Sequence, residues 1–422
     1  MLKVFRSGKM AAILMLGFAS GFPLYLTSRT LQAWMTVAGV NLTAIGFFSL
    51  VSLPYSLKFL WSPFIDRFRL PFLGRRKGWL FVTQVALAAT IAGMILQRPS
   101  QLLQLLAINA FLIAFLSATQ DIVIDAYVTD ISDASEVGAA SGVKVLGYRI
   151  AMIATGGGAL VIADFISWQT VYLLMGVLML MLAAVSTRVP EPVLRDRPPA
   201  SMNEAIRMPL ADFFARSGTA RGTWILAFIL LYRLGDSMIN NMTTPFLLQK
   251  GFSQTDIGVI QGGVGLFATI AGVLAGGVVI ARIGINRSLW VFGILQAASN
   301  FAYFVLAYVG RQYVVMVAAI VIENVCYGLA TAALVGFIMS LCNPRFSATQ
   351  YALLSSLIAV GRDVIASPSG SIAEKVGWPA FFLISIIAAI PGMLLLPLFA
   401  PWGLRIGDKG SDPEAIRGFM RD

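Results

Sequence analysis

The amino-acid sequence predicts an all-α membrane protein with twelve transmembrane helices, organised as two six-helix halves. Three observations support this prediction. The 422 residues are 58% hydrophobic and only 12% charged, against about a quarter charged in soluble domains. The apolar runs are about 20 residues long, which suits a helix that crosses a bilayer. Short stretches of the first half also recur in the second half.

The spans are defined by apolar runs between charged residues or Gly, Pro and Asn. Backbone in lipid must satisfy its own hydrogen bonds, and the runs lack the alternation of barrel strands, so we expect helices. A positively charged start precedes the first run, but no convincing cleavage site follows, so we interpret this run as a retained span. The predicted spans are 10–36, 43–63, 78–97, 102–127, 138–164, 168–187, 222–248, 254–281, 288–308, 313–341, 347–373 and 378–400.

The distribution of basic residues predicts the orientation. With a cytoplasmic N-terminus, the cytoplasmic segments hold 21 of the 31 Lys and Arg residues and the opposite side holds 4, as the positive-inside rule requires. Both termini are therefore predicted to be cytoplasmic. The formal charge of +11 forms no stripe with interleaved aromatic residues, so we expect no nucleic-acid partner. The other six basic residues lie within spans: Arg29, Lys58, Lys144, Arg149, Arg233 and Arg362.

The two halves resemble each other. "GVNLTAIG" at 39–46 recurs as "GFSQTDIG" at 251–258, "WQTVYL" at 168–173 recurs as "WPAFFL" at 378–383, and "LGYR" at 146–149 corresponds to "AVGR" at 359–362. Two parallel six-helix repeats are the arrangement of major-facilitator transporters. We predict an N-terminal six-helix bundle over 1–187, a cytoplasmic linker over 188–221 with an amphipathic helix in 203–216, a C-terminal bundle over 222–400 and a cytoplasmic tail over 401–422.

The composition argues against an enzyme. The chain has no histidine and two cysteines, which removes Ser-His and Cys-His catalysis and the usual zinc sites. We expect no cofactor and no metal. The protein is expected to be a monomer in the lipid bilayer.

Two carboxylates near the end of the fourth span are candidates for proton coupling. Asp121 and Asp125 lie one helical turn apart on one face, and Asp121 is about 13 Å deeper than Asp130. A carboxylate there costs several kcal/mol unless it is paired, protonated or next to water. Two interpretations stay open: pairing with Lys144 or Arg149 of the next span, or reversible protonation coupled to transport. Glu323, deep in the tenth span, is a third candidate.

The near balance of six bases and about five acids within the spans favours internal pairing for most of these charges, with an excess that an anionic ligand could neutralise. In this architecture spans 1, 4, 7 and 10 line the cavity and spans 2, 5, 8 and 11 flank it. A guanidinium stays charged, so at least some of the four arginines must meet a carboxylate of the protein or of a ligand. Arg233 and Asp236 have the spacing of an intrahelical pair, whereas Asp363 directly follows Arg362 and so is expected to point to another face. Amides beside aromatic rings suit a sugar-like ligand by their abundance, although each residue taken singly more often makes an interhelical hydrogen bond or lies at the membrane interface. The candidate substrate-binding residues are Arg29, Gln32, Trp34, Gln120, Tyr148, Arg149, Arg233, Asn240, Asn324 and Arg362.

The loop after the second predicted span carries a charged motif. "SPFIDRFRLPFLGRRKGW" at 62–79 is similar to the loop signature of major-facilitator proteins, an Asp-Arg followed by Gly-Arg-Arg or Gly-Arg-Lys, with a longer gap here. The resemblance implies that Asp66, Arg67, Arg75 and Arg76 are gate residues that connect the cytoplasmic ends.

Several long strings resemble the AmpG-type muropeptide permeases of Gram-negative inner membranes. They include "LGFASGFPLYLTSRTLQAWM", "IGFFSLVSLPYSLKFLWSPFIDRF", "SATQDIVIDAY", "FGILQAASN" and "CNPRFSATQYALLS". The resemblance implies an inner-membrane importer that takes up N-acetylglucosaminyl-anhydro-N-acetylmuramic acid, with or without its peptide, together with protons, for cell-wall recycling and beta-lactamase induction. It places the functional aspartate at Asp121 and a helix-packing glycine at Gly147.

The C-terminus departs from that family pattern. Well-known members continue with further hydrophobic segments, whereas this chain ends in "GDKGSDPEAIRGFMRD". Import of a siderophore or another amphiphilic anion by the same fold therefore stays open as an alternative.

Overall fold

The computed structural model describes residues 8–67, 74–131, 137–191, 208–342 and 347–402, and these residues contain helices and no strand. In the first half of the chain the helices are α1 (Gly8–Leu26), α2 (Arg29–Val37), α3 (Leu42–Phe47), η2 (Phe48–Ser52), α4 (Leu53–Leu57), η3 (Lys58–Leu60), α5 (Ser62–Arg67), α6 (Arg75–Ala92), η4 (Gly93–Leu96), α7 (Leu103–Ile131), α8 (Val137–Met152), η5 (Ile153–Gly158), α9 (Ala159–Ala163) and α10 (Trp168–Ser186).

The second half begins after the linker helix α11 (Met208–Ser217), which overlaps the stretch 203–216 predicted to be an amphipathic helix. Its helices are α12 (Thr219–Leu231), α13 (Leu234–Gln249), α14 (Gln254–Val259), η7 (Ile260–Val264), α15 (Gly265–Ile283), α16 (Ile285–Val309), α17 (Tyr313–Leu341), α18 (Ser347–Val360), η8 (Gly361–Ile365), α19 (Ser369–Val376), α20 (Trp378–Leu394) and η9 (Leu396–Leu398).

Ten helical segments in the described residues are long and apolar enough to cross a membrane, and the shorter helical stretch Leu42–Leu57 is also apolar. The predicted total of twelve is therefore not confirmed. The two predicted spans without a long helix are 43–63 and 347–373. The first divides into α3, η2, α4 and η3, and the second divides into α18, η8 and α19.

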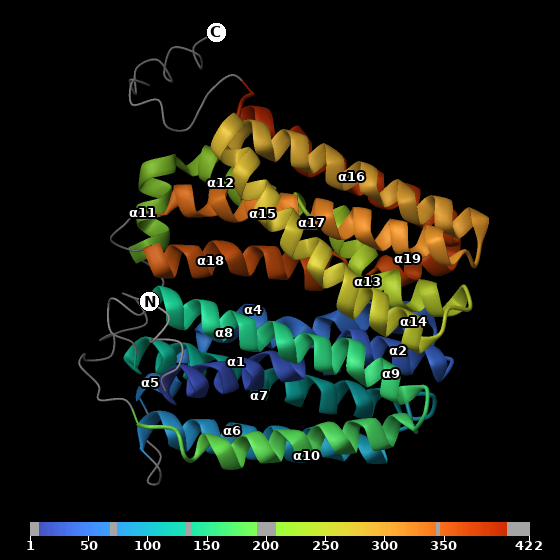
Figure 1. Cartoon of the computed structure of the whole chain (residues 1–422). Helices are drawn as coiled ribbons and strands as arrows, with labels where there is room; N and C mark the ends of the chain where they lie inside the picture. Colours follow the sequence, from blue (N-terminus) through green and yellow to red (C-terminus); the bar gives the residue numbers. More distant parts are fainter. Residues whose placement is uncertain (1–7, 68–73, 132–136, 192–207, 343–346, 403–422) are drawn as a thin grey trace.

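The two halves form adjacent groups of helices. Figure 1 shows α1 to α10 on one side of the molecule and α12 to α20 on the other. Within the first half α1 packs on α8 and α6 on α10, and within the second half α17 packs on α15 and α16. Figure 1 also shows α9 and α14 at one end, called here the α9/α14 end, and α5 and α11 at the opposite end, called the α5/α11 end.

Glycines allow the closest helix pairs to approach. A Cβ placed on Gly147 of α8 would lie 2.2 Å from the carbonyl oxygen of Leu14 in α1, and a Cβ on Gly272 of α15 would lie 2.2 Å from the carbonyl oxygen of Val325 in α17. Small residues give helices in lipid this short separation.

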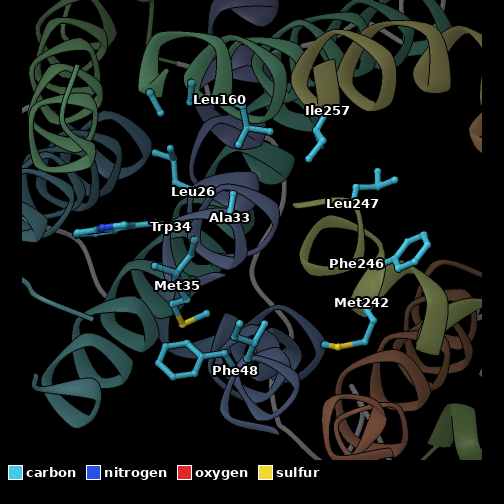
Figure 2. Packing of buried hydrophobic residues seen from close by; sticks show 14 of the residues in the cluster. Leu26, Ala33, Trp34, Met35, Phe48, Leu160, Met242, Phe246, Leu247 and Ile257 are labelled. Atoms are coloured by element: carbon cyan, nitrogen blue, oxygen red, sulfur yellow. The ribbon is translucent and has the colours of Figure 1, made fainter. Parts of the chain in front are cut away.

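The hydrophobic core is shared at one end of the molecule and divided at the other. One cluster of buried side chains joins both halves and includes Leu26, Leu160, Phe246 and Ile257, which Figure 2 shows around the junction. Toward the α5/α11 end the described buried residues form two separate clusters. One cluster contains Met10 and Ile124 of the first half, and the other contains the residues of the second half and α11. The halves therefore adhere mainly through the α9/α14 end.

Irregular helical turns mark the junction between the halves. The segments η5, η7 and η8 are π-helical and η2 is a 3-10 helix. They contact one another in pairs across the junction, η5 with η7 and η2 with η8. Such turns are frequent at functional sites, and here all four lie where one half touches the other.

Candidate functional site

A polar cavity of about 230 Å³ lies between the halves. Arg29 and Gln32 of α2 face it from the first half, and Asn240 of α13 and Arg362 of η8 face it from the second. A smaller cavity of about 90 Å³ shares Arg29 and Asn240 with the first and adds Arg149 and Asn324. Both halves thus contribute to one polar region at their junction.

A break in the first span places Arg29 at this cavity. Helix α1 ends at Leu26 and α2 begins at Arg29. The Nη2 of Arg29 donates to Oδ1 of Asn240 at 3.2 Å, and its guanidinium lies 5.1 Å from the ring centroid of Tyr25. One turn later, Nε2 of Gln32 donates to Oδ1 of Asn241 at 3.0 Å. These contacts join the two halves directly.

Arg233 is paired within its own helix, as the spacing predicts. Its Nη2 lies 2.7 Å from Oδ2 of Asp236, and Nη1 donates to Oγ1 of Thr331 at 2.8 Å. Its guanidinium also lies 3.8 Å from the ring centroid of Tyr327, and Gln296 donates to the other oxygen of Asp236. The charge of this arginine is therefore compensated.

The expectation that Asp363 points away from Arg362 was wrong. Nε of Arg362 lies 2.7 Å from Oδ1 of Asp363. The expectation assumed a regular α-helix, in which adjacent residues do not face each other, whereas both residues lie in the π-helical segment η8. Asp363 also connects the halves, because Ser56 donates to its Oδ2 at 3.3 Å and Ser49 donates to its carbonyl oxygen at 2.8 Å.

Glu323 is buried at 3% exposure beside the cavity wall. Its Oε1 accepts from Nδ2 of Asn240 at 3.4 Å and its Oε2 accepts from Nδ2 of Asn324 at 2.9 Å. Because Asn240 also accepts from Arg29, this single amide connects Arg29 of the first half with Glu323 of the second.

A second charged cluster lies within the first half. Asp121 is 9% exposed, and its Oδ1 accepts from Oγ of Ser20 at 2.5 Å. Nζ of Lys58 lies 3.7 Å from Oδ2 of Asp121 and 3.5 Å from Oδ2 of Asp125, while Lys144 pairs with the other oxygen of Asp125. Of the two aspartates, Asp125 is therefore the one that forms the predicted ion pair with Lys144.

The pairing of Lys58 with the two aspartates was not predicted. Lys58 was visible as one of the six basic residues within spans. Its partner was not visible, because helix packing rather than sequence spacing brings η3 against α7. Arg149 meets neither aspartate: its Nη1 lies 3.8 Å from Sδ of Met152.

Three predicted substrate-binding residues lie outside the walls of the two cavities. Trp34 is 3% exposed and stacks on Trp168 with ring centroids 6.3 Å apart, because it lies on the face of α2 that packs into its own half. Gln120 is fully buried and donates to the carbonyl oxygen of Ala19 at 2.7 Å. Tyr148 packs against Gly21, where an added Cβ would lie 3.0 Å from its ring. We therefore assign all three to packing between helices.

Part of the predicted gate lies outside the described side chains. Nothing is described of the side chains of Asp66, Arg67 and Arg75. Nε of Arg76 lies 2.8 Å from Oδ2 of Asp130, and the backbone amide of Arg76 donates to Glu191 at 2.9 Å. Arg76 is thus connected to the end of α7 within the first half.

The arrangement suits the binding and release of a polar ligand. Guanidinium groups, amides and tyrosine rings surround a cavity between two helical bundles, and the described residues contain no cluster of metal ligands. A polar cavity at the junction of two membrane-embedded halves is the arrangement of a secondary transporter.

The comparisons with known proteins agree with this class. The model of the Major Facilitator Superfamily matches residues 10–366. The chain is 46% identical over 398 residues to the anhydromuropeptide permease of Escherichia coli K12, covering 94% of this chain and 80% of that protein. It is 34% identical over 404 residues to the putative transporter AmpG 4 of Rickettsia conorii, covering 93% and 97%.

A solved bacterial homologue of the lysosomal transporter Spinster has the same fold, with a TM-score of 0.67 at 15% identity over 95% of this chain and 96% of that one. The chain therefore belongs to the AmpG-type muropeptide permeases of the major facilitator superfamily. It is a multi-pass protein of the bacterial inner membrane.

Proposed function

We propose that the protein imports N-acetylglucosaminyl-1,6-anhydro-N-acetylmuramic acid, with or without its peptide, together with protons. The observation that carries the proposal is the identity of 46% to an anhydromuropeptide permease, extended over 94% of this chain. The imported sugar would enter peptidoglycan recycling and supply the signal for beta-lactamase induction.

The chemistry of the cavity supports a cargo of this kind. Asn240 and Gln32 offer amides that can bond hydroxyl and acetamido groups, Tyr25 and Tyr327 offer ring faces, and Arg29 offers a cation. At about 230 Å³ the cavity is smaller than the usual range of about 300 to 1,000 Å³ for ligand pockets. The halves must therefore move apart to admit a disaccharide.

We assign proton coupling to Asp121 with Asp125 in the first half and to Glu323 in the second. Asp121 is buried, yet the lysine near it is shared with Asp125. Protonation of Asp121 would remove its ion pair with Lys58, which would then pair with Asp125 only. The contact of η3 with α7 would loosen as a result. The side-chain amide of Asn240 bonds both Glu323 and Arg29. A change in the charge of Glu323 would therefore alter the hydrogen bonding of Arg29 at the cavity.

The predicted topology assigns the two ends of the molecule to the two sides of the membrane. With cytoplasmic termini, the α9/α14 end faces the periplasm and the α5/α11 end faces the cytoplasm. The shared core at the first end and the divided cores at the second then describe a transporter closed to the periplasm. Asp66, Arg67, Arg75 and Arg76 would fasten the cytoplasmic ends in the opposite state.

The test is uptake of the labelled disaccharide by cells that lack their own permease, with and without a protonophore. We expect accumulation that the protonophore abolishes. Asp121→Asn should lose accumulation against a gradient but keep exchange of internal for external substrate, because exchange needs no net proton movement. Ser20→Ala is the matched control, since it removes one hydrogen bond of Asp121 and leaves the carboxylate.

Two results would contradict the proposal. No uptake by wild-type protein that is folded and inserted would remove the muropeptide cargo, and a competition assay with siderophores would then test the alternative cargo. Normal accumulation by Asp121→Asn would remove this aspartate from proton coupling while leaving the cargo intact.

A further inference from the structure

The six basic residues within the predicted spans fall into two groups in the structure. Four of them have a carboxylate oxygen within 4.0 Å: Lys58, Lys144, Arg233 and Arg362. Arg29 and Arg149 have no such partner among the residues that the structure describes. The nearest bonded neighbours of these two guanidinium groups are neutral, Asn240 for Arg29 and Met152 for Arg149.

The two arginines without a directly bonded carboxylate line the same small space. Arg29 from the start of α2 and Arg149 from the end of α8 both contribute to the cavity of about 90 Å³, together with Asn324 and Gln261 of the second half. Through Arg29 this small cavity adjoins the larger one of about 230 Å³. A guanidinium stays charged at all physiological pH values, so a cation without a carboxylate in such a place calls for an anion.

Charge and hydrogen bonding specify that anion further. The six bases face five acids within the same spans, Asp121, Asp125, Asp236, Glu323 and Asp363. With all five ionised, one positive charge is left, which a single carboxylate neutralises. Nearby, Gln32 is 7% exposed and its Oε1 has no hydrogen-bond partner in the described structure. This oxygen can accept one N–H or O–H from a ligand that lies beside Arg29.

We propose that Arg29 and Arg149 form the carboxylate subsite of the transporter, with the small cavity holding the acid group and the larger cavity holding the sugar. This inference rests on the proposed function and adds the orientation of the cargo within it. In the cargo without peptide the anion is the lactyl carboxylate of the muramic acid, and the acetamido N–H beside it is the donor that suits Gln32. Arg233 and Arg362 then serve to shape the wall, because their charges are already compensated.

The test compares two ligands that differ only in charge. Purified protein is titrated with N-acetylglucosaminyl-anhydro-N-acetylmuramic acid and with its carboxamide, which keeps the shape and loses the negative charge. We expect wild-type protein to prefer the acid by at least tenfold. Arg29→Gln and Arg149→Gln should each weaken binding of the acid by about 10- to 100-fold, the range for hydrogen bonds to charged groups, and change binding of the carboxamide by less than about threefold.

Two further variants separate charge recognition from folding. Arg29→Lys keeps the cation and should restore part of the preference for the acid. The double variant Arg362→Gln/Asp363→Asn removes a compensated pair at the wall of the same cavity and should leave the ratio of the two affinities unchanged. Thermal unfolding in detergent shows for each variant whether the protein is folded.

The outcomes distinguish this inference from the proposed function. The carboxylate subsite alone would be overturned if the Arg29→Gln and Arg149→Gln variants bound the acid and the carboxamide more weakly by the same factor. It would also be overturned if wild-type protein bound both ligands with equal affinity. If only the Arg362→Gln/Asp363→Asn variant loses the preference for the acid over the carboxamide, the carboxylate of the ligand binds elsewhere. That result would also overturn the carboxylate subsite. No binding of either ligand to wild-type protein would overturn the proposed cargo together with the subsite.

Discussion

Asp164 of the first half caps the start of α14 in the second half. Its Oδ2 accepts from the backbone amide of Thr255 at 2.7 Å and from the hydroxyl of Thr255 at 2.5 Å. The pseudo-symmetric position repeats this contact in reverse. Glu374 of the second half accepts from the backbone amide of Thr43 at 3.2 Å and from its hydroxyl at 2.5 Å at the start of α3. Each half thus supplies a carboxylate to a helix N-terminus of the other, where the helix dipole favours negative charge.

We predict that Asp164→Asn and Glu374→Gln together weaken closure of the α9/α14 end. Removing two charge-assisted contacts should raise the population that is open at this end, by several-fold because both contacts are exposed to solvent. The measurement is the rate at which an impermeant thiol reagent labels Ser237→Cys at the cavity, in a protein with Cys326 and Cys342 replaced by Ser. Asp256→Asn is the matched control, because Asp256 caps α14 from within its own helix. Equal labelling of the double variant and the control would contradict the prediction.

Gly262→Ala should impair transport much more than Gly263→Ala. Both glycines lie in η7, but a Cβ on Gly262 would lie 2.8 Å from Cα of Gly157 in the other half, whereas a Cβ on Gly263 meets nothing within 4 Å. The added methyl group therefore separates η7 from η5 only in the first variant. Initial rates of disaccharide uptake, normalised to the amount of protein in the membrane, decide the comparison. Similar rates in both variants would show that the close approach of η5 and η7 is dispensable.

Gly147→Ala should lower thermal stability, while Gly142→Ala should leave it unchanged or raise it slightly. The first substitution forces α8 away from the carbonyl oxygen of Leu14, whereas the second adds a methyl group in open space on the same helix. Overpacking of this kind costs about 1 to 3 kcal/mol. The midpoint of thermal unfolding in detergent is the measurement, and a lower midpoint for Gly142→Ala than for Gly147→Ala would refute the packing argument.

Asp236→Asn should destabilise the protein strongly, and a second substitution should recover much of the loss. Breaking a buried ion pair costs about 3 to 5 kcal/mol because one charge is left uncompensated. The side chain of Arg233 is 10% exposed and that of Asp236 is 2% exposed. Arg233→Met added to Asp236→Asn removes the orphan charge, and Asn keeps an acceptor for Gln296. If the double variant unfolds at the same temperature as Asp236→Asn, the lost ion pair does not explain the effect.

Features within one helix were predictable where the sequence carried a direct physical signal. Apolar length gave the ten long spans, and the spacing of Arg233 and Asp236 gave their ion pair, because both signals act within one helix. The predictions for the second and eleventh spans were less accurate, because η2 and η8 interrupt regular helices at the contact between halves. Composition alone does not indicate where such a turn falls.

The candidate site was predicted only in part for a related reason. Residue type indicated that Arg29, Asn240 and Arg233 are chemically suited to the cavity, but it did not indicate which face of a helix meets a neighbour. Trp34 and Gln120 have suitable side chains and lie in packed interfaces instead. The partners of Lys58 and the places of Ser237 and Tyr327 at the cavity became visible only once distant helices were brought together. The contacts of Asp164 and Glu374 had one sequence signal, the recurrence of Thr in "NLTAIG" and "SQTDIG".

The pairing of Arg233 with Asp236 also affects biogenesis. The two residues are three apart on one helix, so their charges can neutralise each other as soon as that segment leaves the ribosome and becomes helical. The segment with Arg29 has no carboxylate in its own helix, and the neighbour that accepts from this arginine, Asn240, is synthesised more than two hundred residues later. The first half therefore carries this cation without its hydrogen-bond acceptor until the second half has been synthesised.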